Sequence, residues 1–322
     1  MIIDILAHYI SQPVCQILEK TSHYFGSGRD FGYAPYNADL EKRLGVMEKY
    51  GVDIQALSQT APILLGFNAA EAAEICRISN DDNYALCKAY PGKFVNICLI
   101  SLLDMPGALR ELDRDVNELD CRAVAVATSQ AGEGLDSPRF FGFYEKLLEY
   151  NLPLFIHPTN WQANPLVEMR TGWRMMHVFG WPFDTTQAIW RLIFGGVLDR
   201  YPDLKIITHH CGGMLPFFAA RAEENYRSLL LDKLPRDIKE YWTNLYGDTA
   251  LDGSVSAMRC GWDFFGPERL MYGTDYPFGR EFGEQFVREN LAALKKLNLE
   301  NPDLNKILGE NARRLLKINH PG

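Results

Sequence analysis

The amino-acid sequence predicts an α/β protein with the (β/α)8 TIM-barrel fold, formed by residues 1–322 as a single domain. Two observations carry this prediction. Short apolar runs alternate along the chain with amphipathic segments of helical period, and this alternation is typical of a parallel sheet covered by helices. The runs number eight, which is the number of strands that closes a barrel.

The elements are expected in strict alternation, each strand followed by a helix, with one further helix packed on the outside at the C-terminus. Each expected strand is a short apolar run, and each expected helix is a longer segment with one apolar face. The expected strands are at 2–6, 54–57, 94–99, 123–127, 154–156, 204–208, 245–248 and 270–272. The expected helices are at 38–51, 68–90, 104–119, 137–151, 185–200, 214–230, 253–260, 281–297 and 303–317.

Three segments interrupt this alternation, at 9–37, 58–68 and 159–184. All three follow strands, and they are therefore predicted as loop insertions at the carboxyl face of the barrel. The first is long, aromatic and rich in glycine, and a long loop in this position more often covers an active site than serves as padding. Each insertion could equally form a pocket wall or an oligomer contact.

The composition is that of an ordinary globular protein, with 47% hydrophobic and 23% charged residues. A net charge of −8 argues against nucleic acid or an anionic membrane as a partner. The sequence has no apolar run of transmembrane length and no secretory signal at its N-terminus. Seven scattered cysteines without a C-x-x-C pair favour reduced thiols and a cytoplasmic location over a disulfide framework.

The sixth expected strand and the residues after it form the centre of the predicted site. An apolar run at 204–207 is typical of a strand buried on both faces. His209 and His210 follow it, and Gly212 and Gly213 then allow a sharp turn or the close approach of a ligand. Polar residues between a barrel strand and the next helix are where active sites form.

Three other strands also end in residues that can bind a divalent metal. His8 follows the first strand, His157 the fifth and Asp275 the eighth. Imidazoles combined with one carboxylate suit zinc or a similar cation, with a position left open for water or substrate. Any one of these residues alone would more simply cap a strand or a helix, but four such strand ends at one barrel mouth predict a functional polar cluster.

The chain resembles the amidohydrolase-related barrels grouped with 2-amino-3-carboxymuconate-6-semialdehyde decarboxylase. That group includes γ-resorcylate decarboxylase and 4-oxalomesaconate hydratase. The resemblance extends over nearly the whole chain and implies a metal-dependent TIM barrel of the amidohydrolase type. The motifs that carry it lie at 154–158, 181–186, 194–204, 210–216, 272–278 and 307–315.

Carried over from this resemblance, the metal ligands are expected at His8, His157 and Asp275. The catalytic histidine falls on His210, with Asp275 beside it, and the arginine that binds the substrate carboxylate falls on Arg221. Such an arginine can reach the site of a neighbouring subunit, which implies a homodimer or a higher homo-oligomer. The metal is expected to be Zn²⁺, with Mn²⁺ as the alternative. His209 is not at the motif position and is expected to face the barrel wall or to contact the groups that surround the metal ligands.

One position departs from the family pattern. The first strand of the family ends in His-x-His or Glu-x-His, whereas this chain has Leu6 where the first of those ligands would be. Three arrangements remain open: a metal held by the other three ligands with water or substrate, recruitment of His210 as a ligand, or chemistry without a metal. Affinity depends on ligand number and on the groups that orient the ligands, and the retained metal is the favoured arrangement.

The resulting functional prediction is a metal-dependent, non-oxidative decarboxylase of an aromatic or unsaturated carboxylic acid. Arg221 would bind the carboxylate, and Tyr9 and Trp161 would contribute aromatic walls. The alternative is a hydrolase or hydratase of the same superfamily that acts on an ester, a lactone or a C–C bond beside a carbonyl, because Leu6 departs from the decarboxylase pattern. A third hypothesis, a binding module without activity, is disfavoured by the survival of every other polar site residue.

Overall fold

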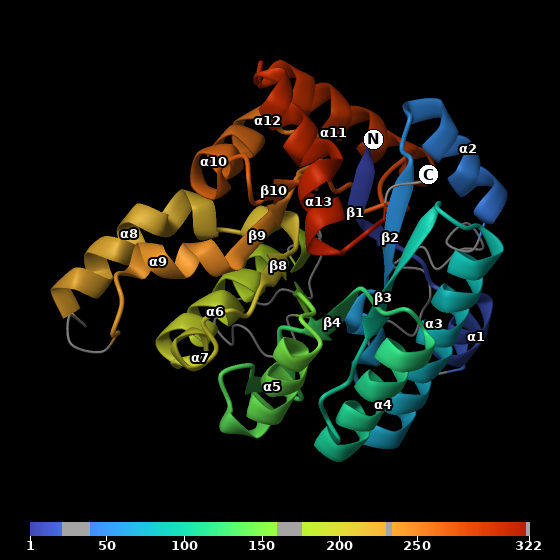
Figure 1. Cartoon of the computed structure of the whole chain (residues 1–322), viewed down its shortest axis with the longest axis horizontal. Coiled ribbons are helices and arrows are strands. Elements are labelled where there is room, and N and C mark those ends of the chain that lie inside the picture. Colours follow the sequence, from blue (N-terminus) through green and yellow to red (C-terminus); the bar gives the residue numbers. More distant parts are fainter. Residues whose placement is uncertain (21–38, 160–175, 230–233, 320–322) are drawn as a thin grey trace.

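The computed structural model describes residues 1–20, 39–159, 176–229 and 234–319. Within them, eight parallel strands form one sheet in the order β1-β2-β3-β4-β7-β8-β9-β10, surrounded by helices (Figure 1). The eight predicted strands and the barrel fold are confirmed. The strands are β1 Ile3–His8, β2 Ile54–Ser58, β3 Phe94–Leu99, β4 Ala123–Ala127, β7 Leu154–His157, β8 Ile206–Thr208, β9 Leu245–Asp248 and β10 Leu270–Met271.

Backbone hydrogen bonds between β1 and the chain from Tyr272 onward close the ring. Ile5 N donates to Tyr272 O at 2.9 Å, and Asp275 N donates to Leu6 O at 2.9 Å. Ala7 and Tyr276 form a parallel bridge. The first strand and the segment after the last strand therefore lie side by side. A separate antiparallel pair, β5 Ser129–Gln130 and β6 Glu133–Gly134, follows β4.

The helices differ from the sequence prediction at several places. A helix, α1, lies within the segment expected as a loop at 9–37, and α6 begins at Trp181, inside the segment expected as a loop at 159–184. The helix expected at 185–200 is two helices separated at Gly195 and Gly196, the helix expected at 303–317 is α12 and α13 joined by a π-helical turn at Lys306–Glu310, and α9 was not expected. Gly196 has a φ of +76°, which ends α6 because a left-handed residue cannot continue a right-handed helix. The helices are α1 Gln12–Glu19, α2 Leu40–Tyr50, α3 Ala69–Ala89, α4 Met105–Glu118, α5 Phe141–Glu149, α6 Trp181–Phe194, α7 Val197–Arg200, α8 Leu215–Leu229, α9 Ile238–Tyr241, α10 Val255–Phe265, α11 Glu284–Lys296, α12 Asn301–Asn305 and α13 Asn311–Leu315.

Local sequence signals fix where the longer helices begin. Asn68 accepts from the backbone N–H groups of Ala70 and Glu71, and the Glu71 carboxylate accepts from Asn68 N, which makes a capping box at the start of α3. Asp39 caps α2 in the same way by accepting from Lys42 N. None of the described helices combines the length and apolarity needed to cross a membrane.

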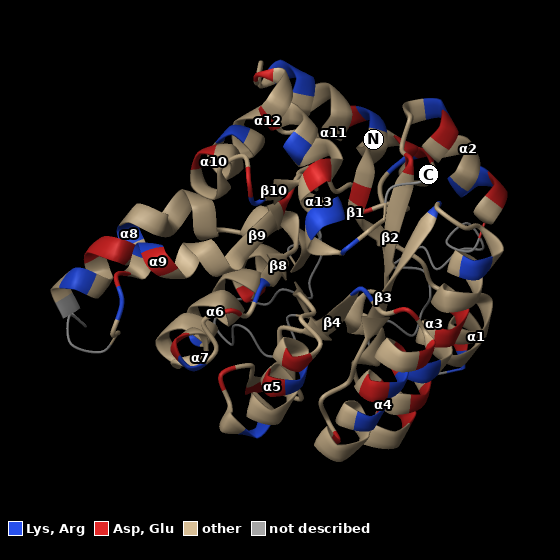
Figure 2. Cartoon of the chain, viewed as in Figure 1, with Lys and Arg blue, Asp and Glu red and all other residues tan. Residues whose placement is uncertain are grey.

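The barrel strands are buried on both faces. In all eight, every residue except Tyr246 is buried, which accounts for their nearly continuous apolar sequences. Figure 2 shows the consequence: the charged residues lie mainly on the helices and loops, and the strands are almost free of them. The functional polar groups are therefore confined to the strand ends.

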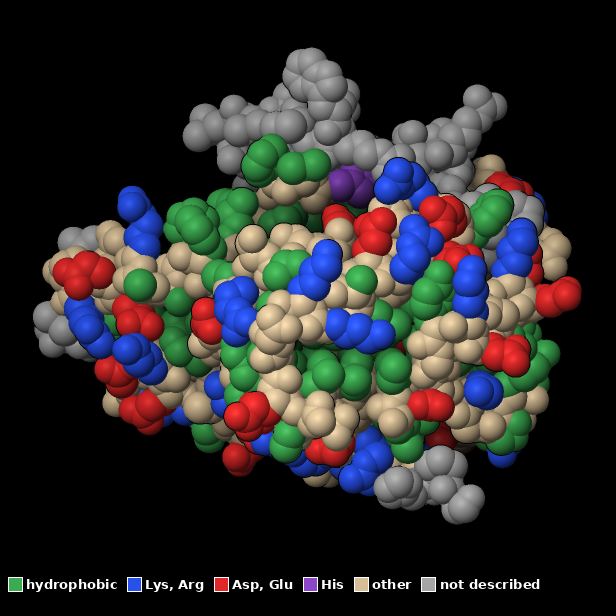
Figure 3. Space-filling model, turned by 90° about the horizontal axis from the view of Figure 1, so that it is seen from above, with side chains coloured by type: hydrophobic (Ala, Val, Ile, Leu, Met, Phe, Trp, Pro, Cys, Tyr) green, Lys and Arg blue, Asp and Glu red, His purple; other side chains and the backbone are tan. Residues whose placement is uncertain are grey.

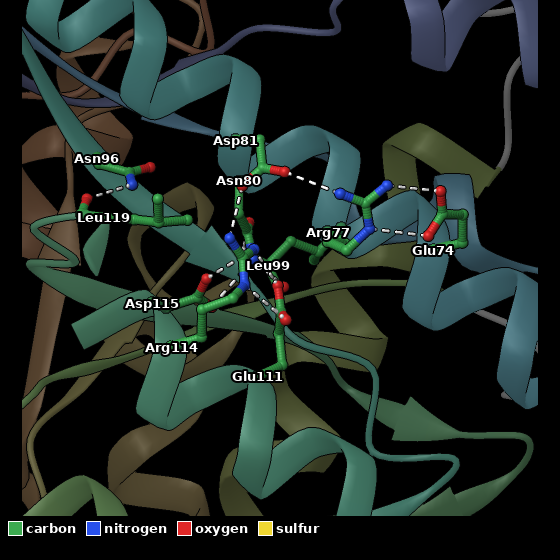
Figure 4. A network of polar contacts seen from close by, with 10 residues as sticks. All are labelled: Glu74, Arg77, Asn80, Asp81, Asn96, Leu99, Glu111, Arg114, Asp115 and Leu119. Atoms are coloured by element: carbon green, nitrogen blue, oxygen red, sulfur yellow. Dashed lines mark hydrogen bonds and ion pairs between the residues drawn. The ribbon is translucent and has the colours of Figure 1, made fainter. Parts of the chain in front are cut away.

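A polar network joins α3 and α4 to the end of β3 (Figure 4). The buried side chain of Asn80 donates to Leu99 O at 3.1 Å and to Asp115 Oδ2 at 3.0 Å, and it accepts from Leu99 N at 2.8 Å. On the outside, Arg114 bonds to Asp81 and Glu111, both at 2.6 Å. Burial, aided by the negative charge of Glu111, raises the pKa of Asp115 to about 8, so this carboxyl is mainly protonated at neutral pH.

Replacing Asn80 should destabilise the fold more than replacing an exposed asparagine on the neighbouring helix. Asn80→Ala leaves Leu99 N, Leu99 O and Asp115 without their buried partner, and each such loss costs about 1–3 kcal/mol. We expect the free energy of unfolding to fall by about 3 kcal/mol in urea titrations. Asn117→Ala, which removes only an exposed bond to Asp113 O, is the control and should change it by less than about 1 kcal/mol. Equal effects would contradict this role of Asn80.

Candidate active site

Polar side chains from five strands meet at the carboxyl end of the barrel. The closing of the ring places the ends of β1, β7, β8, β9 and β10 around one mouth, as in other (β/α)8 barrels. Two of the groups end β1 and β7, two follow β8, one ends β9 and one follows β10. They are His8, His157, His209, His210, Asp248 and Asp275.

Three of the histidines form a compact cluster. One potential ligand nitrogen from each of His8, His157 and His209 lies within 4.8 Å of the other two. The ring centroids of His157 and His209 are 4.7 Å apart, and those of His8 and His157 are 5.3 Å apart. The sequence analysis expected His209 to face the barrel wall or the groups around the ligands; the structure places its ring beside the predicted ligands His8 and His157.

The ring orientations follow from backbone carbonyls. In His157 and His209 the Nδ1 lies against a carbonyl oxygen, which only accepts hydrogen bonds, so in these rings, when neutral, Nδ1 carries the proton and Nε2 carries the lone pair. His8 Nδ1 lies near Ser58 O, and its Nε2 faces the Asp275 carboxylate. Burial lowers the pKa of His157 and of His209 well below the usual value for histidine, and both rings are therefore neutral. The Nδ1–oxygen distances are 3.3 Å from His8 to Ser58, 2.8 Å from His157 to Pro158 and 2.7 Å from His209 to Ile156.

Asp275 contributes the negative charge of the site. Its Oδ1 lies 3.1 Å from His8 Nε2, and its backbone has a φ of +65°, an uncommon conformation for a residue other than glycine. Burial alone would raise the pKa of Asp275, but the hydrogen bond from His8 and the charge on His210 outweigh it and lower the pKa below its usual value. Asp275 is therefore ionised at neutral pH.

His210 points to the opposite side from His209. Its Nδ1 lies 3.0 Å from Ala250 O, and its φ of +49° turns the chain between the two histidines. Burial lowers the pKa of His210, but the charges of Asp275 and Asp248 outweigh that effect and raise it. His210 is therefore the imidazole of this site best suited to carry a proton at neutral pH.

Asp248 fixes the turn that carries His210. Its carboxylate accepts from the backbone N–H groups of His210 at 3.0 Å, Cys211 at 3.2 Å and Ala250 at 2.9 Å. Burial raises the pKa of Asp248 to about 6, against the lowering effect of the His210 charge. The sequence analysis assigned this residue no role, although a carboxylate at the end of a predicted barrel strand was the available signal.

Arg43 holds the end of β1 in place. It is buried, and its Nη2 donates to His8 O at 2.6 Å while its Nη1 donates to Gln55 Oε1 at 2.8 Å. The guanidinium lies over the Tyr276 ring, 4.7 Å from its centroid. Arg43 thus positions the main chain of His8 through hydrogen bonds and stacking.

The structure describes two of the three predicted substrate-binding residues, Tyr9 and Arg221. Tyr9 is half-buried beside Arg43, with 5.7 Å between the guanidinium and the ring centroid. Arg221 is exposed on α8 and lines a cleft of about 800 Å³ with Trp190 and Phe218; the clustered histidines are not among the residues lining it. Trp161 lies outside the described residues.

Comparison with known proteins identifies the family. A family model described as Amidohydrolase matches residues 3–318. The chain belongs to the amidohydrolase family. The 2-amino-3-carboxymuconate-6-semialdehyde decarboxylase of Dictyostelium discoideum is 27% identical over 285 residues, covering 87% of this amidohydrolase and 77% of the relative.

Solved structures agree with this membership. The 5-carboxyvanillate decarboxylase of Sphingomonas paucimobilis matches with a TM-score of 0.86 and 25% identity, covering 99% of both chains. The manganese-bound 5-carboxyvanillate decarboxylase of Novosphingobium aromaticivorans shares the fold, with a TM-score of 0.83, 21% identity and coverage of 99% and 96%. The family predicted from sequence motifs is therefore confirmed.

The site of this amidohydrolase fits a divalent cation. The Nε2 atom of His209 is buried and has no hydrogen-bond partner among the described residues, and buried polar atoms are rarely left so. His8 Nε2 faces the Asp275 carboxylate. Neutral imidazole nitrogens beside an ionised carboxylate are the donor set that zinc and similar cations take. Leu6, which is fully buried, offers no donor.

Removing the Asp248 carboxylate should loosen the turn at His210. Asp248→Ala leaves three backbone N–H groups without their acceptor, so we expect the free energy of unfolding to fall by about 3 kcal/mol and the amides of His210 and Cys211 to exchange with deuterium faster. Asp263→Ala, at an exposed position on α10, is the control. Unchanged exchange at His210 in Asp248→Ala would contradict the role given to this carboxylate.

Proposed function

We propose that this protein is a non-oxidative decarboxylase of a small aromatic or unsaturated carboxylic acid and that it uses a divalent metal. The observation that carries the proposal is the meeting of His8, His157 and Asp275 with a separately oriented His210 at one barrel mouth. The relatives reported above are decarboxylases of such acids, and similarity over nearly the whole chain supports the same reaction class here.

His8, His157 and Asp275 would hold the metal. When bound, the metal would orient the substrate and polarise an oxygen next to the carbon that reacts. The imidazoles favour Zn²⁺ over Mn²⁺, whereas the relative from Novosphingobium was crystallised with manganese. Metal analysis of the protein purified without chelator would decide between these two ions.

His210 would supply the proton that replaces CO₂. Its Nδ1 faces Ala250 O, which leaves Nε2 to donate. The substrate carbon takes the proton from Nε2, the bond from that carbon to the carboxylate breaks, its electron pair returns to the conjugated system and CO₂ leaves. The charges of Asp275 and Asp248 raise the pKa of His210, which favours its protonated form, and solvent restores the proton after each turnover.

We also propose that the protein works as a homodimer in its compartment, the cytoplasm. Arg221 lines an outer cleft between α6 and α8, and Phe194, Phe217 and Phe218 are 40%, 77% and 41% exposed there. Figure 1 shows α8 and α9 projecting together from the barrel. A second copy that covered these phenylalanines would remove apolar surface from water and could receive Arg221 at its own site. The seven free cysteines support a reducing compartment.

Replacing His210 should abolish decarboxylation without emptying the metal site. Loss of a general acid lowers the turnover number by about 100- to 10,000-fold. Purified His210→Asn should show this loss in assays of CO₂ release from hydroxylated benzoates and muconate-type acids, with its metal content unchanged. Release of CO₂ at the wild-type rate would contradict the assignment. Hydrolysis or hydration of esters, lactones or alkenes by the wild type, without any decarboxylation, would support the alternative reaction class.

Placing a charge at the exposed phenylalanine should separate the proposed dimer. We expect Phe217→Asp to sediment as a monomer and the wild type as a dimer in analytical ultracentrifugation. Arg221→Ala should remain dimeric but bind carboxylate substrates about 10- to 100-fold more weakly, because a bidentate ion pair is lost. A monomeric wild type with full activity would contradict the dimer.

A further inference from the structure

We propose that His209 is a metal ligand of this protein and that it replaces the donor missing at Leu6. The inference rests on the proposed function, because it requires that the site bind a divalent metal. It changes the predicted site from two imidazoles and a carboxylate to three imidazoles and a carboxylate, contributed by His8, His157, His209 and Asp275.

The positions of the three rings fit a common metal ion. Zinc binds imidazole nitrogen at about 2.0–2.1 Å, which places the nitrogens of a tetrahedral site about 3.4 Å apart. The ligand atoms of His8, His157 and His209 already lie within 4.8 Å of one another. Shifts of less than about 1 Å in each ring would therefore bring them to bonding distance. The fourth donor, Asp275 Oδ1, lies 3.1 Å from His8 Nε2.

His209 is oriented in the manner of a metal-binding imidazole. Its Nδ1 lies 2.7 Å from Ile156 O, and metal-binding histidines almost always donate their other ring N–H to such an acceptor. Its side chain is 1% exposed, and its Nε2 has no hydrogen-bond partner in the part of the chain that the structure describes. A histidine that served only as wall would leave this buried nitrogen unsatisfied, which is costly.

The family pattern has a metal ligand at the position of Leu6 and none at the position of His209. In this chain the donor lies at His209, and Leu6 has a packing role. Leu6 is fully buried in the apolar cluster that contains Phe155 and Ile207. The Phe155 ring, in turn, packs against His209 with 5.9 Å between ring centroids. Leu6 on the first strand thus contributes packing. The residue that follows β8, the sixth strand of the barrel, contributes the donor that β1 lacks at this position.

The neighbouring His210 is separated from this role by its main chain. His209 is extended, with a φ of −73° and a ψ of 151°, whereas His210 has a φ of +49°. The two rings consequently bond to different neighbours, Ile156 O in β7 and Ala250 O after β9. His209 can therefore bind metal while His210 stays free to transfer a proton.

Metal affinity separates the two histidines experimentally. The chelator-treated wild type, His209→Asn and His210→Asn are titrated with Zn²⁺ in competition with a chromophoric chelator. We expect His209→Asn to bind Zn²⁺ at least about 100-fold more weakly, since even the loss of a supporting group costs 10- to 100-fold, and His210→Asn to stay within about 3-fold of the wild type. Thermal unfolding of the metal-free proteins establishes that both variants fold.

Two further measurements keep the test independent of how well the variant folds. In His209→Asn with Leu6→His, the restored donor on β1 should recover most of the lost affinity. In the ¹⁵N-histidine NMR spectrum of the folded wild type, Zn²⁺ should shift the Nε2 resonances of His8, His157 and His209, and should not shift the pair of resonances that His210→Asn removes.

The outcomes distinguish this inference from the proposed function. Wild-type Zn²⁺ affinity in a folded His209→Asn, or an unshifted His209 resonance, would overturn the inference and leave the decarboxylase proposal standing. Metal binding that depends on His209, in a protein that releases no CO₂ from any tested acid, would support the inference and count against the decarboxylase. A wild type that binds no divalent metal would overturn the inference together with the metal-dependent part of the proposed function.

Discussion

The hydrogen bonds that join β1 to the segment after β10 are the constraint on which the site depends. Asp275 N donates to Leu6 O at 2.9 Å, and His8 N donates to Tyr276 O at 2.6 Å. These bonds close the barrel, and they also bring a carboxylate from one end of the chain to an imidazole from the other. Asp4 strengthens the junction by accepting from Thr274 N and Thr274 Oγ1, and Arg43 holds the carbonyl of His8.

The site is a polar, charged region at the mouth of a barrel whose strands are otherwise largely apolar. The strands carry few ionisable groups, and on the face drawn in Figure 3 acidic and basic side chains are interspersed without a large region of one sign. Within the mouth, the neutral rings of His157 and His209 lie beside His210, whose pKa is raised, and the ionised Asp275, and the low local dielectric strengthens each interaction. The same burial that lowers the pKa of His157 and His209 leaves their nitrogens available to a cation.

The fold could be predicted from the sequence because the pattern of strand and helix repeats along the chain. Eight apolar runs and the amphipathic segments between them define the barrel, and the parallel topology then places His8, His157, His210 and Asp275 at one mouth. The orientation of His209 could not be predicted, because the directions of two adjacent side chains depend on the backbone angle between them. The role of Asp248 likewise arises from tertiary hydrogen bonds that have no periodic signature. The helix α9 is only four residues long, too short for a periodic pattern, although Asp237 and Glu240 form a capping box at its start.

The hydrogen bonds that orient the histidine rings have an evolutionary consequence. Ile156, Pro158 and Ala250 contribute their carbonyl oxygens to these bonds, and a carbonyl is present whichever amino acid occupies the position. Substitutions there can change packing while the rings keep their acceptors. The path of the main chain thus sets the orientation of each ring. A metal donor can be gained or lost at one position, as at Leu6, while the hydrogen bonds that orient the other rings stay in place.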